Sequence, residues 1–453
     1  MLPKEFETRM RKILGDEYEL LAKELENGRP ERSFRVNNAK IENEDFSRIN
    51  PFSSTPISYT DGAYYFDDEK IGNHPYHHAG MIYVQDPAAM SVLNAIDIKE
   101  GIRALDMCSA PGGKSSQIAA KIGKNGILVS NEYVSSRCKM MVGNFERLGL
   151  SNTVATNVDT KTLADWFSEY FDLVLVDAPC SGEGMFRKNE LAISEWSEEN
   201  VKTCAERQKD ILRNALKTLR AGGYLIYSTC TFALEENEMQ IDELLSEYPE
   251  LSLVRAKPEL EENTSDGVTF DGAKSKDLAI CRRFYPHRQK GEGQFFAIMK
   301  KSGDGEGRIN YKDASTPLSR QEKEITEKFL SQTLEDYSDL DIRKYNDNIV
   351  AVPNGFPLPP QRVFCSGVML GEISKNIFTP HHQFFSAFAS RFKRKLSLTL
   401  DDKRTLDYLS GQVIPCDIEN GYAVVTVDGV GLGGCKVVDG MAKNHYPKGL
   451  RIK

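Results

Sequence analysis

Residues 103–132 read RALDMCSAPGGKSSQIAAKIGKNGILVSNE. An apolar run is followed by a turn of small residues, then by a helical pattern and a second apolar run. At the turn, Pro111, Gly112 and Gly113 leave the backbone uncovered, and the helix that follows presents free N–H groups at its start. This stretch therefore predicts a strand, a ligand-binding loop, a helix and a second strand.

The same alternation continues through the middle of the chain. We expect strands at 102–107, 126–132, 153–159, 171–179 and 223–230, separated by helices near 114–122, 134–149, 161–169 and 200–220. Short apolar strands separated by helices are typical of right-handed βαβ crossovers and of a parallel sheet covered on both faces. Two further runs, CRRFYPHR and GQFFAIMKK, lie close enough in sequence to pair antiparallel at the sheet edge. The predicted fold class is α/β.

Four units are expected along the 453 residues, a length that suits several domains. Residues 1–75 form a small α+β unit, and residues 76–301 form the α/β domain. Residues 302–389 comprise a linker and a first C-terminal domain. Residues 390–453 form a compact β-rich module.

Local signals support these divisions. A charged helical pattern covers 4–26, and a Gly/Ser/Asp-rich segment at 302–319 is typical of a linker. A helix is expected at 319–336. Near the end, Asp428 and Gly429 separate two apolar runs, which predicts a hairpin with a tight turn.

The composition is that of a soluble globular protein, with 40% hydrophobic and 27% charged residues. No apolar run reaches the length of a membrane span, and the charged start lacks the core of a signal peptide, so we expect a cytoplasmic protein. The nine cysteines are scattered without a C-x-x-C pair, which argues against disulfides and a zinc ribbon. The one histidine cluster, HPYHH at 74–78, lacks partner ligands, and no metal is expected.

The net charge of −8 hides an uneven distribution. Basic residues concentrate at 282–290, 391–395 and 443–453, with aromatic residues between them. Cations beside stacking rings suit phosphates and unpaired bases, so these runs favour RNA as a partner. The aromatic residues in question are Phe284, Tyr285, Phe392 and Tyr446.

Two other nucleotide motifs fail in this loop. Gly113, Lys114 and Ser115 match the end of a P-loop, but its first glycine would fall at Cys108. The dinucleotide fingerprint G-x-G-x-x-G is absent as well. The loop is therefore not expected to belong to an NTPase or a dinucleotide-binding protein.

An acidic residue ends three consecutive predicted strands. Glu132 can accept from ribose hydroxyls, and Asp159 can accept from an adenine amino group. Asp177 ends the next strand. Acidic residues also cap helices, which is the alternative reading, but three at one sheet edge favour a nucleoside cleft.

Two cysteines follow neighbouring predicted strands, Cys180 in DAPCSGEG and Cys230 in YSTCTF. Buried cysteines are often plain core residues, but these lie past the apolar runs, among Ser, Thr and Gly. Methylation of a pyrimidine at C5 needs such thiols, since a thiolate adding at C6 makes C5 nucleophilic and a second thiol can help release. Asp177 can accept from the cytosine amino group. The residues alone leave open which cysteine attacks.

Together, DMCSAPGGKSS, Glu132, Asp159, DAPCSGEG and STCTF resemble the Nop/Sun family of RNA cytosine-C5 methyltransferases. The resemblance covers about 80–300 and implies a Rossmann-like class I domain with a mostly parallel seven-stranded sheet. It implies that Cys230 is the nucleophile and that Cys180 assists product release. It further implies S-adenosylmethionine as the methyl donor, held by Cys108, Ser109, Ala110, Pro111, Gly112, Gly113, Lys114, Glu132, Asp159 and Asp177. Ser109 departs from the usual alanine, which a small side chain should tolerate.

The flanks, with FRVNN (34–38), GMIYVQDPAAM (80–90) and the closing KVVDGMAKNHYPKGLRIK, resemble the bacterial RsmF type within this family. That resemblance implies an RNA-recognition-like N-terminal unit and a PUA-like RNA-binding module at 390–453. It implies 16S ribosomal RNA, or the small ribosomal subunit, as the partner. The expected oligomeric state is a monomer.

Two other functions stay open at this point. One is a ribosome-assembly factor that keeps the fold and binds RNA without catalysis. The other is a methyltransferase acting on a small molecule or a protein. The presence of both cysteines argues against the first, and the basic, aromatic tail argues against the second.

Overall fold

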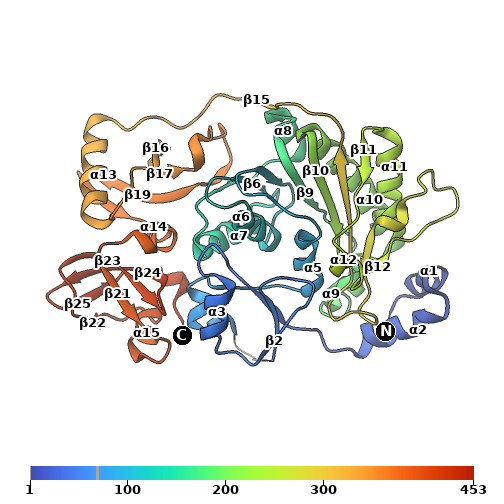
Figure 1. The fold of residues 1–453 in the computed structure, drawn as a ribbon, viewed down its shortest axis with the longest axis horizontal. Coiled ribbons are helices and arrows are strands. Elements are labelled where there is room, and N and C mark those ends of the chain that lie inside the picture. The colour runs from blue at the N-terminus through green and yellow to red at the C-terminus, as the bar shows by residue number, and fades with distance from the viewer. Residues whose placement is uncertain (1, 68–70, 453) are drawn as a thin grey trace.

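The computed structural model describes residues 2–67 and 71–452. Figure 1 shows a central α/β body, with the N-terminal helices at one end and the C-terminal units at the other. No helix within the described residues is long and apolar enough to cross a membrane.

The central sheet confirms the predicted fold class. It has 10 strands, and seven of them follow the order β7-β6-β5-β9-β10-β14-β13. The first five are parallel, whereas β14 runs antiparallel to both of its neighbours in that order. Their bounds are β5 Arg103–Asp106, β6 Ile127–Asn131, β7 Thr153–Thr156, β9 Phe171–Asp177, β10 Leu219–Thr229, β13 Arg282–Phe284 and β14 Gln294–Lys301. Strands β11 (Leu251–Leu253) and β12 (Ser265–Asp266) extend one edge.

Helices cover both faces of this sheet, because the strands present apolar side chains alternately to either side. On strand β5, Leu105 belongs to one buried cluster and Ala104 to the other. The first cluster contains residues of α8 (Thr160–Trp166), α10 (Glu198–Thr218) and α11 (Glu238–Glu247). The second contains residues of α5 (Pro87–Ser91), α6 (Gly113–Ile122) and α7 (Ser135–Leu148).

The N-terminal unit starts with two helices, so the prediction of a single helix over 4–26 is wrong. Helix α1 (Lys4–Leu14) ends at Gly15, whose φ of 58° lies in the left-handed region, and α2 (Tyr18–Asn27) follows. A sheet of order β2-β3-β1-β4 comes next. Its bounds are β1 Ser33–Val36, β2 Ser54–Pro56, β3 Ala63–Phe66 and β4 Ile82–Val84, with α3 (Asn43–Ile49) and α4 (Pro75–His78) beside it.

The segment that follows the α/β domain packs back against that domain. Strand β18 (Val363–Ser366) pairs antiparallel with β7 and so forms an edge of the central sheet. The linker also contributes β15 (Arg308–Ile309), which pairs with β8 (Phe167–Ser168). The rest of this segment is α13 Arg320–Thr333, β16 Asp341–Tyr345, β17 Asn348–Val352, β19 Val368–Ser374, β20 Ile377–Pro380 and α14 His382–Ala387.

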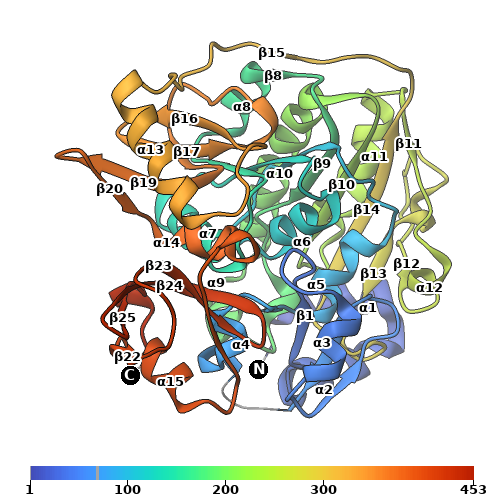
Figure 2. The same cartoon turned by 60° about the vertical axis from the view of Figure 1, so that its left-hand side comes forward.

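The C-terminal module is a five-stranded sheet of order β21-β23-β24-β25-β22, shown in red in Figure 2. Strands β23 (Gly421–Val427) and β24 (Val430–Val438) form the predicted hairpin. Its turn residues Asp428 and Gly429 both have positive φ, 46° and 85°. The remaining elements are β21 Lys395–Leu398, α15 Lys403–Leu409, β22 Ile414–Pro415 and β25 Met441–Asn444.

This module shares one apolar core with the N-terminal unit. Phe34 and Phe46 of the N-terminal unit belong to the same buried cluster as Leu396 and Val425 of the module. The hydroxyl of Tyr76 also donates to Asp428 Oδ2 over 2.8 Å. The N-terminal sheet and the C-terminal module therefore pack as one body beside the α/β domain, whereas α1 and α2 pack against Phe186 and Trp196 of that domain.

Candidate active site

The Gly-rich loop connects β5 to α6, as the sequence predicts. Gly112 has a φ of 100°, and a Cβ there would lie 3.0 Å from the Phe145 ring. A Cβ at Gly113 would lie 3.1 Å from the Gln85 side chain. The prediction that glycine is needed for close approach of a ligand is therefore incomplete, because neighbouring side chains already restrict these positions.

An arginine from the N-terminal unit holds this loop, which the sequence did not indicate. Arg35 of β1 donates to the Gly113 carbonyl over 2.9 Å and to Ser116 Oγ over 2.5 Å. Arg35 is buried, and burial lowers the pKa of its guanidinium to about 10. The N-terminal unit and the start of α6 are thus fixed to one another.

Asp106 ends β5 beneath the loop and is fully buried. Its Oδ2 accepts from Ser115 Oγ over 2.6 Å, while its Oδ1 has no hydrogen-bond partner within the described chain. Burial raises the pKa of Asp106 to about 7, although the Ser115 hydrogen bond lowers it. Asp106 Oδ1 is therefore a buried acceptor atom beside the loop with no protein partner among the described residues.

The two predicted nucleoside-binding acids have local partners. Glu132 Oε1 accepts from the Val134 amide over 2.8 Å, and its Oε2 lies 3.5 Å from Arg137. Asp159 caps α8, accepting from the Thr162 amide over 2.8 Å and from its hydroxyl over 2.9 Å. The hydrogen bond from the Thr162 amide lowers the pKa of Asp159. The capping reading therefore applies to Asp159, while its predicted contact with adenine stays a prediction.

Asp177 connects the Gly-rich loop between β5 and α6 (hereafter the donor loop) to strands β9 and β10, which precede the two cysteines. Lys114 Nζ of the donor loop lies 2.8 Å from Asp177 Oδ1, and only 7% of the Lys114 side chain is exposed. Ser228 Oγ of β10 donates to the same oxygen over 2.6 Å. One carboxylate therefore holds the ends of three elements at the same sheet edge.

The two predicted cysteines meet at that edge. Cys180 Sγ and Cys230 Sγ lie 3.3 Å apart, just beyond the ends of the parallel strands β9 and β10. The hydrogen bond to Cys230, together with burial, raises the pKa of the Cys180 thiol well above its usual range. The two sulfurs are in direct contact, and either can donate in this hydrogen bond.

The sequence also predicts that Cys108, Cys138 and Cys204 are inert thiols; Cys138 and Cys204 are buried, and Cys108 is half-buried. Burial raises the pKa of Cys138 to about 12 and that of Cys204 to about 11. Burial also raises the pKa of Cys108, which lies in the donor loop. A raised pKa leaves little thiolate, so these groups have the character of structural thiols.

Several buried residues around the cysteines were missed from the sequence. Glu183 and Glu236 are 1% and 0% exposed, and each lies within six residues of a cysteine of the pair. Glu183 is an acidic residue inside a run of small and apolar residues, whereas Glu236 lies in the acidic run EENE, where nothing in the sequence distinguishes it. Charged residues are almost never fully buried unless they have partners, so they indicate a built arrangement.

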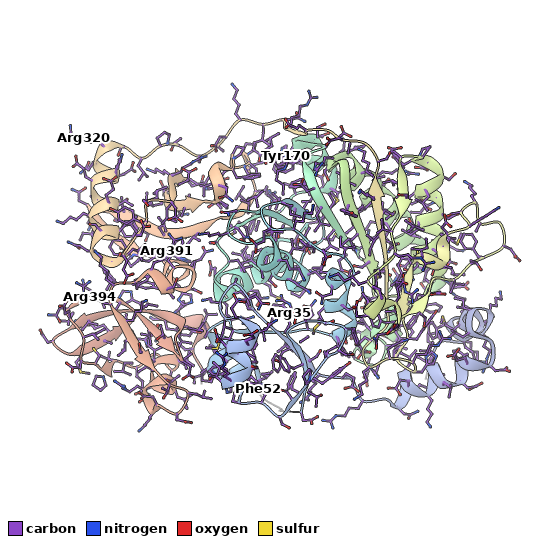
Figure 3. All side chains as sticks on the ribbon, in the orientation of Figure 1. Arg35, Phe52, Tyr170, Arg320, Arg391 and Arg394 are labelled. Carbon is purple, nitrogen blue, oxygen red and sulfur yellow. The ribbon has the colours of Figure 1, made fainter. Side chains whose placement is uncertain are left out.

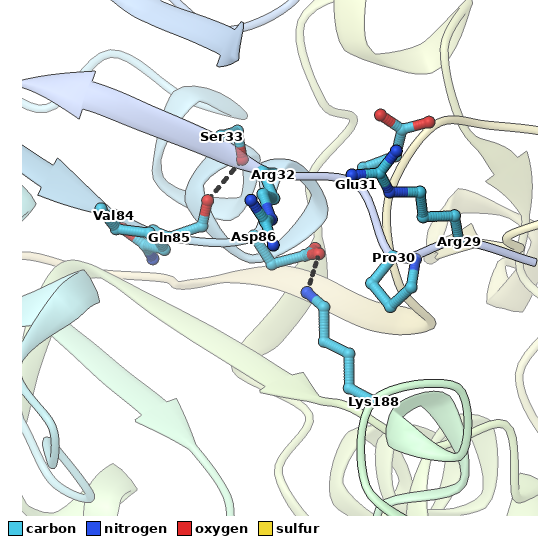
Figure 4. A pocket seen from close by; sticks show the side chains of 9 residues that line it. All are labelled: Arg29, Pro30, Glu31, Arg32, Ser33, Val84, Gln85, Asp86 and Lys188. Atoms are coloured by element: carbon cyan, nitrogen blue, oxygen red, sulfur yellow. Dashed lines mark hydrogen bonds and ion pairs between the residues drawn. The ribbon is translucent and has the colours of Figure 1, made fainter. Parts of the chain in front are cut away.

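A pocket of about 440 Å³ lies between the N-terminal unit and the loop that follows Cys180 (Figure 4). Arg29 and Arg32 line one side, and Lys188 reaches across to Asp86, with 3.0 Å between Nζ and Oδ2. Arg29 is exposed. The pocket therefore combines Arg29, Arg32 and Lys188 with the acidic residues Glu31 and Asp86, beside the loop that follows Cys180.

The prediction that four aromatic residues of the basic runs stack on RNA bases is wrong. The four rings are 0–2% exposed and belong to the core, so they cannot stack on bases: Phe284, Tyr285, Phe392 and Tyr446. Two of the arginines beside them, Arg282 and Arg283, are buried as well. The basic residues Arg391 and Arg394 lie at the opposite end of the molecule from α1 (Figure 3). All three residues of strand β13 are buried, so the basic and aromatic residues at Arg282–Phe284 belong to the core.

The histidine cluster has a structural role. His74 caps α4, with its Nδ1 accepting from the Tyr76 amide, and His78 bonds the Tyr446 hydroxyl over 2.8 Å. Burial lowers the pKa of His77 to about 3. In the part of the chain that the structure describes, no group of three or more potential ligands is arranged for a metal ion.

A central sheet of this order, with a Gly-rich loop after β5, defines the chain as a Rossmann-like methyltransferase. Three family models match it: 16S rRNA methyltransferase RsmB/F over residues 93–300, the N-terminal domain of 16S rRNA methyltransferase RsmF over 2–87, and the methyltransferase RsmF PUA domain over 395–452.

Individual relatives agree with these matches. The chain is 31% identical over 437 residues to ribosomal RNA small subunit methyltransferase F of Vibrio vulnificus, covering 92% of this chain and 91% of that protein. The crystal structure of a methyltransferase homolog protein from Pyrococcus horikoshii is 27% identical, with a TM-score of 0.58, over 66% of this chain and 95% of that one. NSun6 from Pyrococcus horikoshii with SFG shares the fold at 20% identity and a TM-score of 0.57, over 67% of this chain and 99% of that one. The chain belongs to the RsmB/F family of 16S rRNA methyltransferases.

Proposed function

We propose that this protein transfers a methyl group from S-adenosylmethionine to C5 of a cytosine in 16S ribosomal RNA, through a covalent bond between Cys230 and C6. The observation that carries the proposal is the cysteine pair, with 3.3 Å between the two sulfurs at the sheet edge that also holds the donor loop. Methyl transfer to a nitrogen or an oxygen has no need of a thiol pair.

The residues beside the donor loop fit the proposed donor. Four carboxyl groups surround the edge, from Asp106, Glu132, Asp159 and Asp177, and Asp106 Oδ1 has no partner within the described chain. An acidic setting suits a sulfonium cation, and carboxylates after successive strands suit ribose hydroxyls and an amino group. The donor, when bound, would supply an electrophilic methyl group.

The cysteine pair supports an asymmetric division of labour. The lone pair of the Cys230 thiolate forms the bond to C6, and the electrons of the C5–C6 double bond become available at C5. That electron pair forms the bond from C5 to the methyl group. A base then removes the C5 proton, the electrons of the C5–H bond restore the C5–C6 double bond, and the Cys230–C6 bond breaks with its electrons leaving on sulfur. Cys180, which its raised pKa keeps protonated, stabilises the departing sulfur by an S–H···S hydrogen bond.

Asp177 suits recognition of cytosine rather than uracil. Its Oδ1 accepts from Lys114 and Ser228, and the carboxylate is 35% exposed, so acceptor capacity is left for an exocyclic amino group. Uracil presents a carbonyl at that position, which a carboxylate would repel. In this proposal Asp177 is a cytosine-reading residue that also borders the donor site.

The flanking units suit delivery of RNA. A cytosine inside a helix must be flipped out before a thiol can reach C6, at a cost of a few kcal/mol. Contacts to the phosphate backbone can offset that cost. The PUA-type module and the N-terminal unit form one body beside the catalytic domain and would supply these contacts.

The test is direct. Purified protein is incubated with S-adenosylmethionine and 16S ribosomal RNA, free or in the small subunit, and the RNA is sequenced after bisulfite treatment. The expected result is at least one cytosine protected from conversion only when protein and donor are both present. Methylation at a position other than cytosine C5 would contradict the proposal, and RNA binding without methylation would favour a non-catalytic assembly factor.

A further inference from the structure

Two buried glutamates hold the cysteine loops in a reciprocal arrangement. Glu236, six residues beyond Cys230, accepts from the Ser181 amide over 3.0 Å and from the Ser181 hydroxyl. Ser181 directly follows Cys180. The carboxylate of one loop therefore fixes the backbone beside the cysteine of the other.

The second glutamate repeats this contact in the opposite direction. Glu183, three residues beyond Cys180, accepts from the Phe232 amide over 3.0 Å. Phe232 lies two residues beyond Cys230. The other Glu183 oxygen accepts from Trp196 Nε1 over 2.9 Å.

Further hydrogen bonds close the space between the loops. Ser181 Oγ and Thr231 Oγ1 lie 2.9 Å apart, and each belongs to the residue that directly follows a cysteine. The Gly184 amide donates to the Cys230 carbonyl over 2.9 Å. Gln208 Nε2 of α10 donates both to Glu236 Oε2 over 2.8 Å and to the Pro179 carbonyl over 2.9 Å.

Burial of the two carboxyl groups of Glu183 and Glu236 costs desolvation free energy, which a contact on the protein surface would not. Taking a carboxylate out of water is unfavourable, and several hydrogen bonds are required to offset it. Burial raises the pKa of Glu236 to about 7, although its hydrogen bonds from Ser181 and Gln208 lower it. The negative charge of Glu236 also contributes to the raised pKa of Cys180.

We propose that Glu236 and Glu183 are positioning residues that hold the two cysteine loops in one register, and that Glu236 in addition keeps the two thiols unequal, with Cys180 as the hydrogen-bond donor and Cys230 as the attacking sulfur. The proposal rests on the proposed function for its catalytic consequence. The predicted difference in reactivity between the Cys180 and Cys230 thiols does not depend on the proposed function.

The first experiment needs no RNA and no methyl donor. The full chain carrying Glu236→Gln is treated with iodoacetamide, and the rates of alkylation of Cys180 and Cys230 are measured by mass spectrometry. In the unaltered protein, Cys230 should be alkylated faster. Glu236→Gln should shift the Cys180-to-Cys230 ratio of rates by at least about threefold toward Cys180, since the neighbouring charge is lost.

The matched control is Glu235→Gln. Glu235 is adjacent in sequence, and its carboxylate pairs with Arg9 over 2.6 Å rather than with Ser181 of the Cys180 loop. In this variant the ratio should equal that of the unaltered protein within the error of the measurement. An equal ratio in Glu236→Gln and Glu235→Gln would overturn the proposal.

The second experiment measures single-turnover methyl transfer to 16S ribosomal RNA. Because small displacements of reacting groups can cost up to about a hundredfold in rate, Glu236→Gln and Glu183→Gln should each slow transfer by at least about tenfold, with donor affinity unchanged. Unchanged rates in both variants would overturn the positioning role. If the unaltered protein transfers no methyl group to RNA, the proposed function fails, while the alkylation ratios still decide the arrangement of the thiols.

A variant that fails to fold does not end the test. Ser181→Ala removes the hydroxyl that donates to Glu236 but keeps the Ser181 amide hydrogen bond, so the loop should stay in place. The alkylation ratio should then shift by a smaller factor, about twofold. No shift of the ratio in a folded Ser181→Ala protein would overturn the proposal.

Discussion

Lys114 Nζ and Asp177 Oδ1 form an ion pair of 2.8 Å between the donor loop and the strand that leads to Cys180. The lysine starts helix α6, after the central strand β5, while the aspartate ends the neighbouring strand β9. Parallel strands end at the same sheet edge, which brings the two loops together. The pair fixes the distance between the donor loop and the acceptor loop.

Lys114→Met should therefore uncouple the two loops. Loss of the cation leaves the Asp177 carboxylate with Ser228 as its remaining donor, and removing one partner of a mostly buried pair costs a few kcal/mol. We expect methyl transfer to fall by about a hundredfold, measured as incorporation of labelled methyl groups into 16S ribosomal RNA. The exposed Lys124, changed to Met, is the control and should leave the rate within about twofold. A Lys114→Met protein with full activity would argue against the role of the pair.

The roles of the two cysteines can be separated by alanine substitution. Cys230→Ala should abolish methylation and form no covalent adduct, since no sulfur is left to attack C6. Cys180→Ala should slow release and accumulate a protein–RNA adduct, visible as a band of reduced mobility on a denaturing gel. The opposite pattern would exchange the two roles.

The buried Asp106 should make stability depend on pH in a defined direction. Its pKa is raised from 3.8 to about 7 in the folded protein, so the folded state binds the proton more tightly than the unfolded state does. Its stabilising contribution is complete below about pH 4 and is lost as the pH rises to about 7, by up to about 4 kcal/mol.

Asp106→Asn removes this titration. The stability difference between the variant and the unaltered protein should shift in favour of the variant from pH 4 to pH 8. It is measured at each pH as the difference between the urea midpoints of the two proteins. The exposed Asp165, changed to Asn, should show no such difference. A difference that is equal at both pH values would contradict the assignment.

The pocket in Figure 4 should contribute to RNA binding through Arg29. Arg29→Ala should weaken binding to 16S ribosomal RNA and reduce the slope of log K against log salt by about one, as expected for one lost phosphate contact. Arg320 on α13 is 94% exposed at the opposite end of the molecule and provides the control. Equal slopes for Arg29→Ala and Arg320→Ala would remove Arg29 from the RNA surface.

The strands and helices of the catalytic domain were predictable because their apolar periodicity is local. The run 171–179 predicts β9, and 200–220 predicts α10, each within two residues of the ends found. The helix over 4–26 fails because a single residue, Gly15, adopts a left-handed conformation. A glycine inside a charged helical pattern does not reveal by itself whether it interrupts the helix.

The aromatic residues of the basic runs show another limit. Tyr285 and Phe392 lie among cations in the sequence, yet both are buried. The Tyr285 ring stacks on Phe232 and the Phe392 ring stacks on Phe385, so each ring faces apolar partners and not solvent. Which face is covered depends on the elements that pack there, and these come from distant segments.

The sequence by itself determined the α/β fold, the position of the donor loop after its strand, and the two cysteines at the ends of adjacent strands, because each depends on short-range periodicity and on the rule that parallel strands end at one edge. Only the tertiary structure decided the 3.3 Å between the sulfurs of Cys180 and Cys230, the reciprocal contacts of Glu183 and Glu236, and the core shared by the N-terminal sheet and the C-terminal module. These depend on contacts between segments far apart in the chain, where a displacement of one ångström separates a hydrogen bond from none.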